Sequence, residues 1–556
     1  MKMKTEKARW VAALLTVALL ACITYSLSDV VFQTNDDQTI ICLANGGVTG
    51  SPAAGSGFTS YGYGLLLAGL YGRWPGVPWH ALLLSAGIWL CLTAILRSLF
   101  FLCAQKRQSP LLGLAAFLAL YAGVGMKFVC YLQFTTAAGF GGAAAAALLF
   151  TLPQGRRACR WCGFFAMAAV LFGLLLRPES GLLALPVPLL AGLWQGLTRR
   201  RRPALMVCAV AVALTAGVWL ADGALHAALV PGWQESQAFD SASAVVLDYR
   251  NTDETYRLAR QHTDWTEELC QCFRNWELLF DRRFNTETLN RIAALAEAAD
   301  PGPAPLTLAH KTLSMFKNTR EFRWNALAYG ILGLWALVLF LRRRDGLSAL
   351  AVVAVGASLV AVVALFYGWL NRLPDRVAFV YALPSYTALL FLWGEAVSVR
   401  KRWIGLALLL AAAVLTVAVQ PQDVLVLNNL SRRYRAAAAY EANVYAARHP
   451  QYVYVTDVSQ AFYAFETETP PVNLVEWCSP LIRSAAYQEK FRLLGYPQGL
   501  DTLNLADEKV RLLIHSPAAV NRLTAALEAD GLDWQWEEEM RLDALSVYRL
   551  KKTGQP

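Results

Sequence analysis

Two adjacent carboxylates, Asp36 and Asp37, come soon after the first long apolar segment of the chain. Charge held close to hydrocarbon is costly and is usually kept for function. Neighbouring residues point about 100° apart in a helix, so these two carboxylates are unlikely to form a dyad that shares one proton. Asp36 alone can serve as a general base toward an attacking hydroxyl, with Asp37 in a structural role. The alternative is that this acidic pair has no catalytic role and only caps a helix at residues 38–44.

Four basic residues depart from the charge pattern of the rest of the chain. Around the apolar segments, most Lys and Arg residues gather in short clusters on alternate joints, whereas these four lie near the other joints: Lys127, Arg177, Arg372 and Arg376. An anionic lipid phosphate would explain them, because a guanidinium offers a planar fork of donors to phosphate oxygens. The alternative is snorkelling toward headgroups, or ion pairing of Arg177 with Glu179 and of Arg372 or Arg376 with Asp375.

The sequence does not indicate a metal or another cofactor. Cys159 and Cys162 have CxxC spacing, but they stand beside basic residues without a second pair or a nearby His. Most of the other cysteines lie in apolar segments, where a thiol acts as a small hydrophobic group. The six His residues are dispersed along the chain.

The composition indicates a membrane protein. Of the 556 residues, 56% are hydrophobic and only 16% are charged, and the mean hydropathy is +0.37. Soluble domains are about 25% charged. The net charge of +10 lies in short clusters between apolar segments, which is a topology signal rather than a nucleic-acid surface. We therefore expect a multi-pass protein of the cell membrane and no nucleic-acid partner.

Crossing a bilayer takes about 20 apolar residues. About eleven segments satisfy this: 10–28, 79–104, 110–127, 130–152, 161–177, 180–197, 204–224, 325–341, 347–369, 377–396 and 403–420. We expect the first to be an anchor, with a cleaved signal peptide as the alternative. The basic residues before this anchor then lie on the same side of the membrane as the other basic clusters. By the positive-inside rule, that side is cytoplasmic. Residues 58–71 are too short to cross, and we expect them to be interfacial or re-entrant.

The predicted fold is an α-helical polytopic membrane protein of about eleven transmembrane helices, with a helical insertion and a small C-terminal α/β domain outside the cytoplasm. The C-terminal domain is expected from a helix at 431–448, strands near 452–455, 472–475, 510–514 and 545–550, and a helix at 518–529. The four pieces are a transmembrane module at 1–224 with an external loop at 29–78, the insertion at 225–324, a second transmembrane module at 325–420, and the domain at 421–556.

This arrangement resembles the GT-C superfamily, integral-membrane glycosyltransferases that use polyprenyl-phosphate sugars. The resemblance rests on the number of spans, the acidic pair in the first external loop, the arginines at external joints and the external C-terminal domain. Asn35-Asp36-Asp37, the stretch 47–52 and the stretch Gln133 to Gly139 also resemble uncharacterised bacterial members and phage-type glucosyltransferases. The resemblance covers about residues 1–420.

The resemblance implies a role for each candidate residue. Asp36 would be the base or would orient the acceptor, and Arg177, Arg372 and Arg376, with Lys127, would hold the lipid phosphate. A second acid belongs in a later external loop, where Glu179 ranks before Asp248 and Asp375. The implied partners are a polyprenyl-phosphate-linked sugar, an extracytoplasmic acceptor (wall polymer, glycolipid or protein) and the bilayer.

Three other functions fit the same composition. A transporter or flippase of lipid-linked sugars would typically show an internal repeat and charges at mid-membrane, neither of which is visible here. A non-catalytic scaffold could bind envelope components through its external domains. A transferase that moves a lipid-linked phosphate group is a narrower alternative on the same scaffold.

Overall fold

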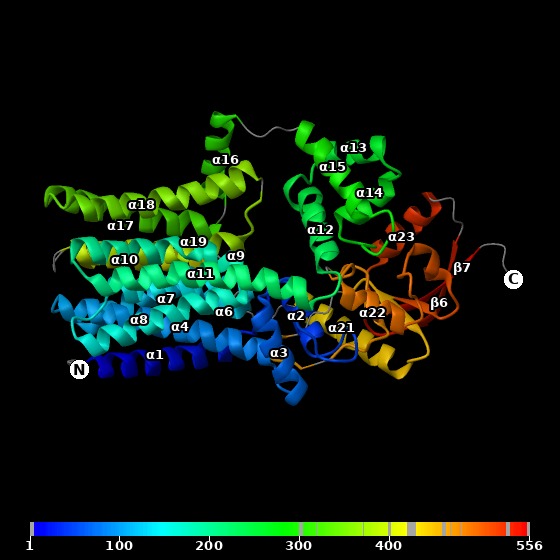
Figure 1. Cartoon of the computed structure of the whole chain (residues 1–556), viewed down its shortest axis with the longest axis horizontal. Coiled ribbons are helices and arrows are strands. Elements are labelled where there is room, and N and C mark those ends of the chain that lie inside the picture. Colours follow the sequence, from blue (N-terminus) through cyan, green and yellow to red (C-terminus); the bar gives the residue numbers. More distant parts are fainter. Residues whose placement is uncertain are drawn as a thin grey trace. The chain divides into compact units, whose positions relative to one another are not determined.

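The computed structural model describes residues 5–299, 304–318, 320–370, 372–397, 402–419, 430–458, 463–467, 469–479, 481–529 and 534–552. The chain divides into two compact units, each built from three separate segments. Unit 1 contains Met1–Val31, His80–Asp222 and Pro303–Asn428, and unit 2 contains Phe32–Trp79, Gly223–Gly302 and Asn429–Pro556. Figure 1 labels most of the helices and the strands β6 and β7.

Unit 1 is built from helices. They are α1 (Glu6–Leu27), α4 (Trp79–Gln105), α5 (Pro110–Leu120), α6 (Met126–Cys130), α7 (Phe134–Phe150), α8 (Arg156–Leu176), α9 (Pro178–Ala184), α10 (Pro186–Thr198), α11 (Arg202–Leu229), α16 (Pro305–Asn318), α17 (Arg320–Arg342), α18 (Gly346–Val363), α19 (Asp375–Ala396) and α20 (Arg402–Val419). Single π-helical turns follow α5 at Tyr121–Gly125 and α18 at Ala364–Trp369. The short strands β1 (Val31–Phe32) and β2 (Tyr131–Leu132) pair with each other.

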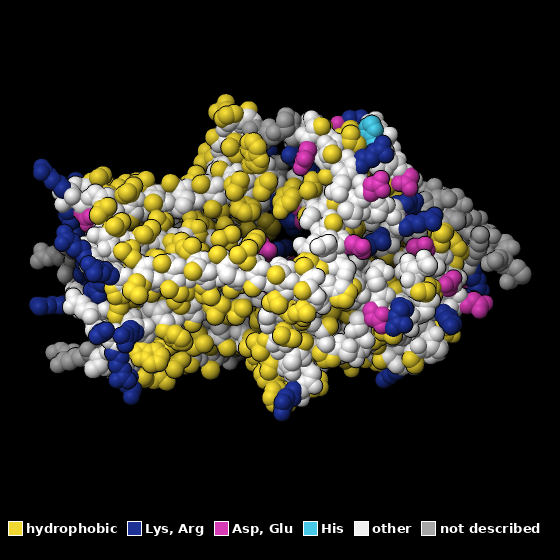
Figure 2. Space-filling view, in the orientation of Figure 1, with side chains coloured by type: hydrophobic (Ala, Val, Ile, Leu, Met, Phe, Trp, Pro, Cys, Tyr) yellow, Lys and Arg dark blue, Asp and Glu magenta, His cyan; other side chains and the backbone are white. Residues whose placement is uncertain are grey.

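The multi-pass membrane architecture is confirmed. Among the described residues, nine helices are long and apolar enough to cross a bilayer, and they coincide with nine of the predicted segments. The other two segments are also helical, as α7 with 17 residues and α20 with 18. Large apolar side chains are exposed on the outer helices, as Figure 2 shows, and a surface of this kind faces lipid. The side of the membrane on which each loop lies stays a prediction.

α7 is the central helix of unit 1, and all of its residues are buried. Its small side chains let neighbouring backbones approach: a Cβ at Gly139 would lie 2.9 Å from Cα of Val380 in α19, and one at Gly141 would lie 2.5 Å from the carbonyl oxygen of Ala169 in α8. Small residues at helix interfaces are the usual route to close packing in membranes. The segment predicted at 130–152 therefore forms a shorter helix that is enclosed by protein.

Ion pairs join the helices at the end of unit 1 where α7 finishes. The carboxylate of Glu395 in α19 lies 2.8 Å from Nζ of Lys106, after α4, and 2.8 Å from Nη2 of Arg199, after α10. Arg97 of α4 is fully buried, pairs with Glu6 of α1 and donates to Oγ1 of Thr151 at 3.1 Å. These contacts tie helices that are distant in sequence.

Unit 2 combines the first loop, most of the insertion and the C-terminal domain around one hydrophobic core. Leu43, Phe273 and Val455 of this core come from the three segments. The helices are α2 (Asn35–Ala44), α3 (Tyr61–Arg73), α12 (Trp233–Ala244), a π-helical turn (Val245–Tyr249), α13 (Asp253–His262), α14 (Glu267–Arg274), α15 (Thr286–Ala299), α21 (Leu430–Arg448), α22 (Ala485–Leu493), a 3-10 turn (Thr502–Ala506) and α23 (Pro517–Ala529). With 13 residues, α3 is too short to cross a bilayer, as expected for 58–71.

The C-terminal segment contains a mixed five-stranded sheet in the order β4-β3-β5-β7-β6, which confirms the predicted α/β domain. The strands are β3 (Val453–Thr456), β4 (Leu474–Glu476), β5 (Val510–Ile514), β6 (Trp534–Arg541) and β7 (Ser546–Lys552). β3 is parallel to β4 and β5, whereas β7 is antiparallel to β5 and β6. β6 was not predicted, because this edge strand carries mostly exposed charged side chains in place of an apolar pattern.

Candidate functional site

The candidate site lies in unit 1 at the end where α7 and α19 begin. The two helices run parallel, because Gly139 is opposite Val380 and Phe150 stacks on Phe391, with ring centroids 5.9 Å apart. Their N-termini therefore lie at one end of the bundle. The exposed N–H groups of a helix N-terminus carry partial positive charge and favour an anion.

Gln133 starts α7 from a fully buried position. Its backbone is extended, its Oε1 accepts from the N–H of Thr136 at 3.1 Å, and its carbonyl accepts from Oγ1 of Thr136 at 2.9 Å. The amide Nε2 of Gln133 has no hydrogen-bond partner in the part of the chain that the structure describes. A buried donor without a partner is costly, and such groups are often found where a ligand binds.

Arg177 separates α8 from α9 and reaches the first turn of α7. The residue before a proline avoids the helical conformation, and Arg177, which precedes Pro178, is extended. Its Nη1 donates to Oγ1 of Thr135 at 3.3 Å, and its guanidinium lies 5.5 Å from the ring centroid of Phe134. Its Nε lies 3.6 Å from Oε2 of Glu179. The predicted pairing of Arg177 with Glu179 is thus present, although the Glu179 side chain is 63% exposed.

Lys127 of α6 pairs with Asp375, the first residue of α19. Nζ of Lys127 lies 3.2 Å from Oδ2 of Asp375. Asp375 thus has a partner that the sequence did not suggest, and its expected pairing with Arg372 or Arg376 stays a prediction. Lys127 reaches this carboxylate because α6 packs on the start of α19, where the ring centroids of Phe128 and Phe379 are 4.0 Å apart.

The two remaining arginines flank Asp375. The backbone N–H of Arg372 donates to the carbonyl of Phe366 at 2.9 Å, and its side chain is half-buried. Arg376 lies in the first turn of α19, is also half-buried and makes no ion pair with any residue that the structure describes. Phe379, one turn later, contacts Phe140 of α7 at a centroid distance of 5.2 Å. Lys127, Arg177, Arg372 and Arg376 are thus gathered around the starts of two adjacent helices.

Asp36 and Asp37 lie in unit 2, in the first turn of α2. Asp37 is fully buried, and its Oδ2 lies 3.5 Å from Oγ1 of Thr34. Burial raises the pKa of Tyr63, in α3, well above its usual value, and nearby Tyr71 and Asp37 raise it further. Asp36 is half-buried. The two carboxylates therefore occupy different environments, one enclosed beside tyrosines and one partly open.

The other two candidate acids lie in different units, and Glu179 pairs with a cation of the candidate site. Asp248 lies in the π-helical turn of unit 2, and Glu179 lies at the start of α9. No group of three or more His, Cys, Asp or Glu residues able to hold a metal occurs among the described residues. Gln133 and Thr135 were not predicted as site residues. The available signal was a polar Gln-x-Thr-Thr stretch inside an apolar segment.

No family model matches the chain, and no curated protein matches its sequence. Solved structures do show a similarity. The chain resembles ArnT. The crystal structure of ArnT from Cupriavidus metallidurans in the apo state aligns over 98% of both chains, with a TM-score of 0.41 and 13% identity. The same protein bound to undecaprenyl phosphate aligns over 97% of both chains, with a TM-score of 0.39 and 14% identity.

Proposed function

We propose that this chain is a GT-C-type membrane glycosyltransferase, which moves a sugar from a polyprenyl-phosphate donor to an acceptor outside the cytoplasm. One observation carries the proposal: Arg177 and Lys127 converge with Arg372 and Arg376 on the starts of α7 and α19, at one end of an apolar bundle. Cations are costly beside hydrocarbon, and the four cations outnumber the two carboxylates, Glu179 and Asp375, that pair with Arg177 and Lys127, so the excess positive charge calls for an anion. The phosphate of a lipid that lies along the bundle supplies it.

This arrangement suits phosphate as a leaving group. When the bond between the sugar anomeric carbon and the phosphate oxygen breaks, the electron pair stays on the lipid phosphate. Arginine donors near that oxygen stabilise the developing charge without a metal. Arg177 is held on one side by Thr135 and Phe134, and its Nη2 has no hydrogen bond to any described residue. It can therefore donate to the phosphate without losing its anchor.

Asp36 is the proposed base. It would take the proton from the acceptor hydroxyl as that oxygen attacks the anomeric carbon, and would pass the proton on to water. Asp36 is partly open and has no ion pair with a described residue, whereas Asp37 is enclosed with Thr34 and Tyr63. These environments support a role for Asp36 as the base and a role for Asp37 in positioning α2.

The decisive experiment measures release of lipid phosphate. Purified full-length protein is incubated with labelled polyprenyl-phosphate sugars, and free polyprenyl phosphate is quantified. We expect release by the wild type and a loss of 100-fold or more in Arg177→Ala, which removes a donor that acts in the transition state (about 3 kcal/mol). Arg343→Ala, which changes an exposed arginine after α17, is the matched control.

Two results would overturn the proposal. Equal release by wild type and Arg177→Ala would remove Arg177 from the site. Movement of intact lipid-linked sugar across a vesicle membrane, without any release of lipid phosphate, would instead identify a transporter.

A further inference from the structure

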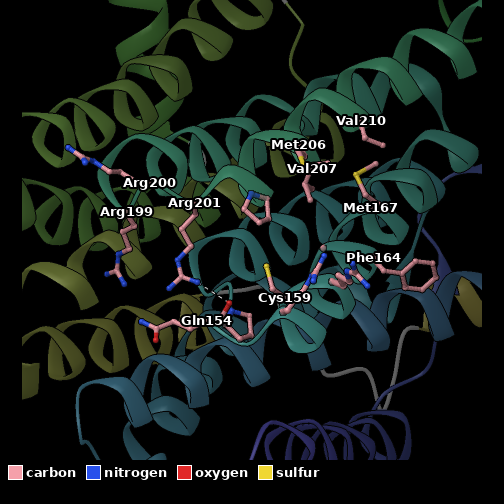
Figure 3. Close-up of a pocket in the computed structure, with 15 residues that line it drawn as sticks. Gln154, Cys159, Phe164, Met167, Arg199, Arg200, Arg201, Met206, Val207 and Val210 are labelled. Atoms are coloured by element: carbon pink, nitrogen blue, oxygen red, sulfur yellow. Dashed lines mark hydrogen bonds between the residues drawn. The ribbon is translucent and has the colours of Figure 1, made fainter.

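A groove lined by arginines opens in unit 1 between α8 and α11, at the end away from the candidate site. Its volume is about 990 Å³. Figure 3 shows Arg199, Arg200 and Arg201 on one side of the groove and Met206, Val207 and Val210 toward the other. Arg156 and Arg160 of α8 also line it. The groove is thus cationic at one end and apolar along its length.

The apolar part of the groove faces the surface of the bundle. Phe164 of α8 is 59% exposed and Met206 of α11 is 68% exposed, so these side chains are accessible to an acyl chain. At the base the two helices come together, since a Cβ on Gly163 would lie 3.2 Å from Cγ2 of Val207. An acyl chain can therefore lie along this groove in contact with both helices.

At its cationic end, the groove has arginine side chains whose N–H donors are available to a ligand. Arg199 is neutralised by Glu395, and Nη1 of Arg201 donates to the carbonyl of Pro153 at 2.9 Å. Arg156, Arg160 and Arg200 are exposed, and none has an ion pair with a residue that the structure describes. None of the described residues that line the groove is acidic. Like charges gathered in this way repel one another, and a bound anion would offset that repulsion.

We propose that this groove binds an anionic phospholipid, with its phosphate among Arg156, Arg160 and Arg200 and an acyl chain against Phe164 and Met206. Charge and shape both favour this ligand. A soluble phosphate would leave the apolar length unused, and a zwitterionic lipid would leave the excess positive charge uncompensated. Basic pockets between transmembrane helices commonly take such headgroups. This site is independent of the proposed transferase activity.

The test measures lipid binding to the full-length protein in a neutral detergent. Native mass spectrometry follows titrations with dioleoylphosphatidylglycerol, dioleoylphosphatidylcholine and inorganic phosphate. A basic residue near an anionic lipid contributes about fivefold in affinity. We therefore expect R156Q/R160Q/R200Q to bind phosphatidylglycerol at least tenfold more weakly than wild type. We expect R342Q/R343Q/R344Q, which removes the same charge from the exposed joint after α17, to bind it like wild type.

Val210→Trp separates a lipid from a free anion, because it fills the apolar part of the groove without changing the charge. We expect it to weaken phosphatidylglycerol binding severalfold. Equal affinity of the wild type for phosphatidylcholine, or equal losses in the two triple variants, would refute a specific anionic site. Tight binding of inorganic phosphate together with an unaffected Val210→Trp would show a soluble-anion site and overturn the lipid assignment.

Discussion

Nη1 of Arg177 donates to Oγ1 of Thr135 at 3.3 Å, so the guanidinium that follows α8 is held on the first turn of α7. The contact joins residues that are 42 positions apart in sequence. It places a cation beside the N-terminus of a buried helix, where the guanidinium and the helix dipole both attract an anion.

Removing this anchor should impair transfer without unfolding the protein. Thr135→Val keeps the shape of the side chain but removes the acceptor of Arg177. A hydrogen bond to a charged group contributes about 1.5–3 kcal/mol, so we expect the rate of lipid-phosphate release to fall by about tenfold or more. Thr135→Ser, which keeps the hydroxyl, should retain most activity. If the serine variant is as impaired as the valine variant, the hydroxyl has no such role.

Substitution of the two adjacent carboxylates should affect different properties, transfer activity for one and stability for the other. Asp36→Asn should reduce transfer by at least 100-fold with little change in melting temperature, because it removes a base, which contributes about 10²–10⁴-fold. Asp37→Asn should chiefly lower the melting temperature, because the carboxylate is fully buried beside Thr34. Transfer assays and thermal unfolding on the same preparations separate the two effects. Normal transfer by Asp36→Asn would exclude Asp36 as the base.

Gly139 should be intolerant of even a methyl group. A Cβ there would lie 2.9 Å from Cα of Val380, which is backbone and cannot rotate away. Overpacking of this kind costs about 1–3 kcal/mol, so Gly139→Ala should lower the melting temperature of the detergent-solubilised protein. Gly217→Ala in α11 is the control, because no described atom beyond the neighbouring residues and backbone of its own helix lies within 4 Å of its Cβ position. Equal melting temperatures for both variants would show that α7 and α19 are not packed this closely.

The buried pair of Arg97 and Glu6 should be more costly to break than to replace. Arg97 is fully buried, so Glu6→Leu leaves its charge without a counter-ion, which costs about 3–5 kcal/mol. Replacing both in Glu6→Leu/Arg97→Met removes the buried charge and should recover most of the loss. A double variant that melts no higher than Glu6→Leu would contradict this coupling. Thermal unfolding of the three proteins makes the comparison.

Lys490 should give unit 2 a characteristic pH dependence. Burial lowers the pKa of Lys490 to about 8, with Glu476 opposing the shift. Between about pH 8 and the usual lysine value of about 10.4, the unfolded chain binds more protons than the folded one, so stability rises with pH. The gain is up to about 3 kcal/mol across this range. Lys490→Met should lack this rise. Denaturant unfolding at several pH values measures this rise in stability. The same dependence of stability on pH in the wild type and in Lys490→Met would exclude Lys490 as its cause.

The spans and the sheet could be predicted because their signals are local. Long apolar runs imply helices in a bilayer whatever surrounds them, and β5 was predicted at 510–514 from its run of aliphatic residues. β6 carries no such signal, because pairing with β7 makes it a strand while its side chains stay in solvent. Its strand conformation comes from a partner, which a local pattern does not reveal.

The sequence by itself determined which residues depart from the charge pattern, and it singled out Lys127, Arg177, Arg372 and Arg376 together with Asp36 and Asp37. Only the tertiary structure decided which groups meet. Lys127 pairs with Asp375 across 248 positions, and Arg177 is held by Thr135. The physical reason is that α7, whose glycines admit the backbones of α8 and α19, sets which helix ends lie side by side. Close packing of this kind depends on the surfaces of both partners, and a single stretch of sequence specifies only one of them.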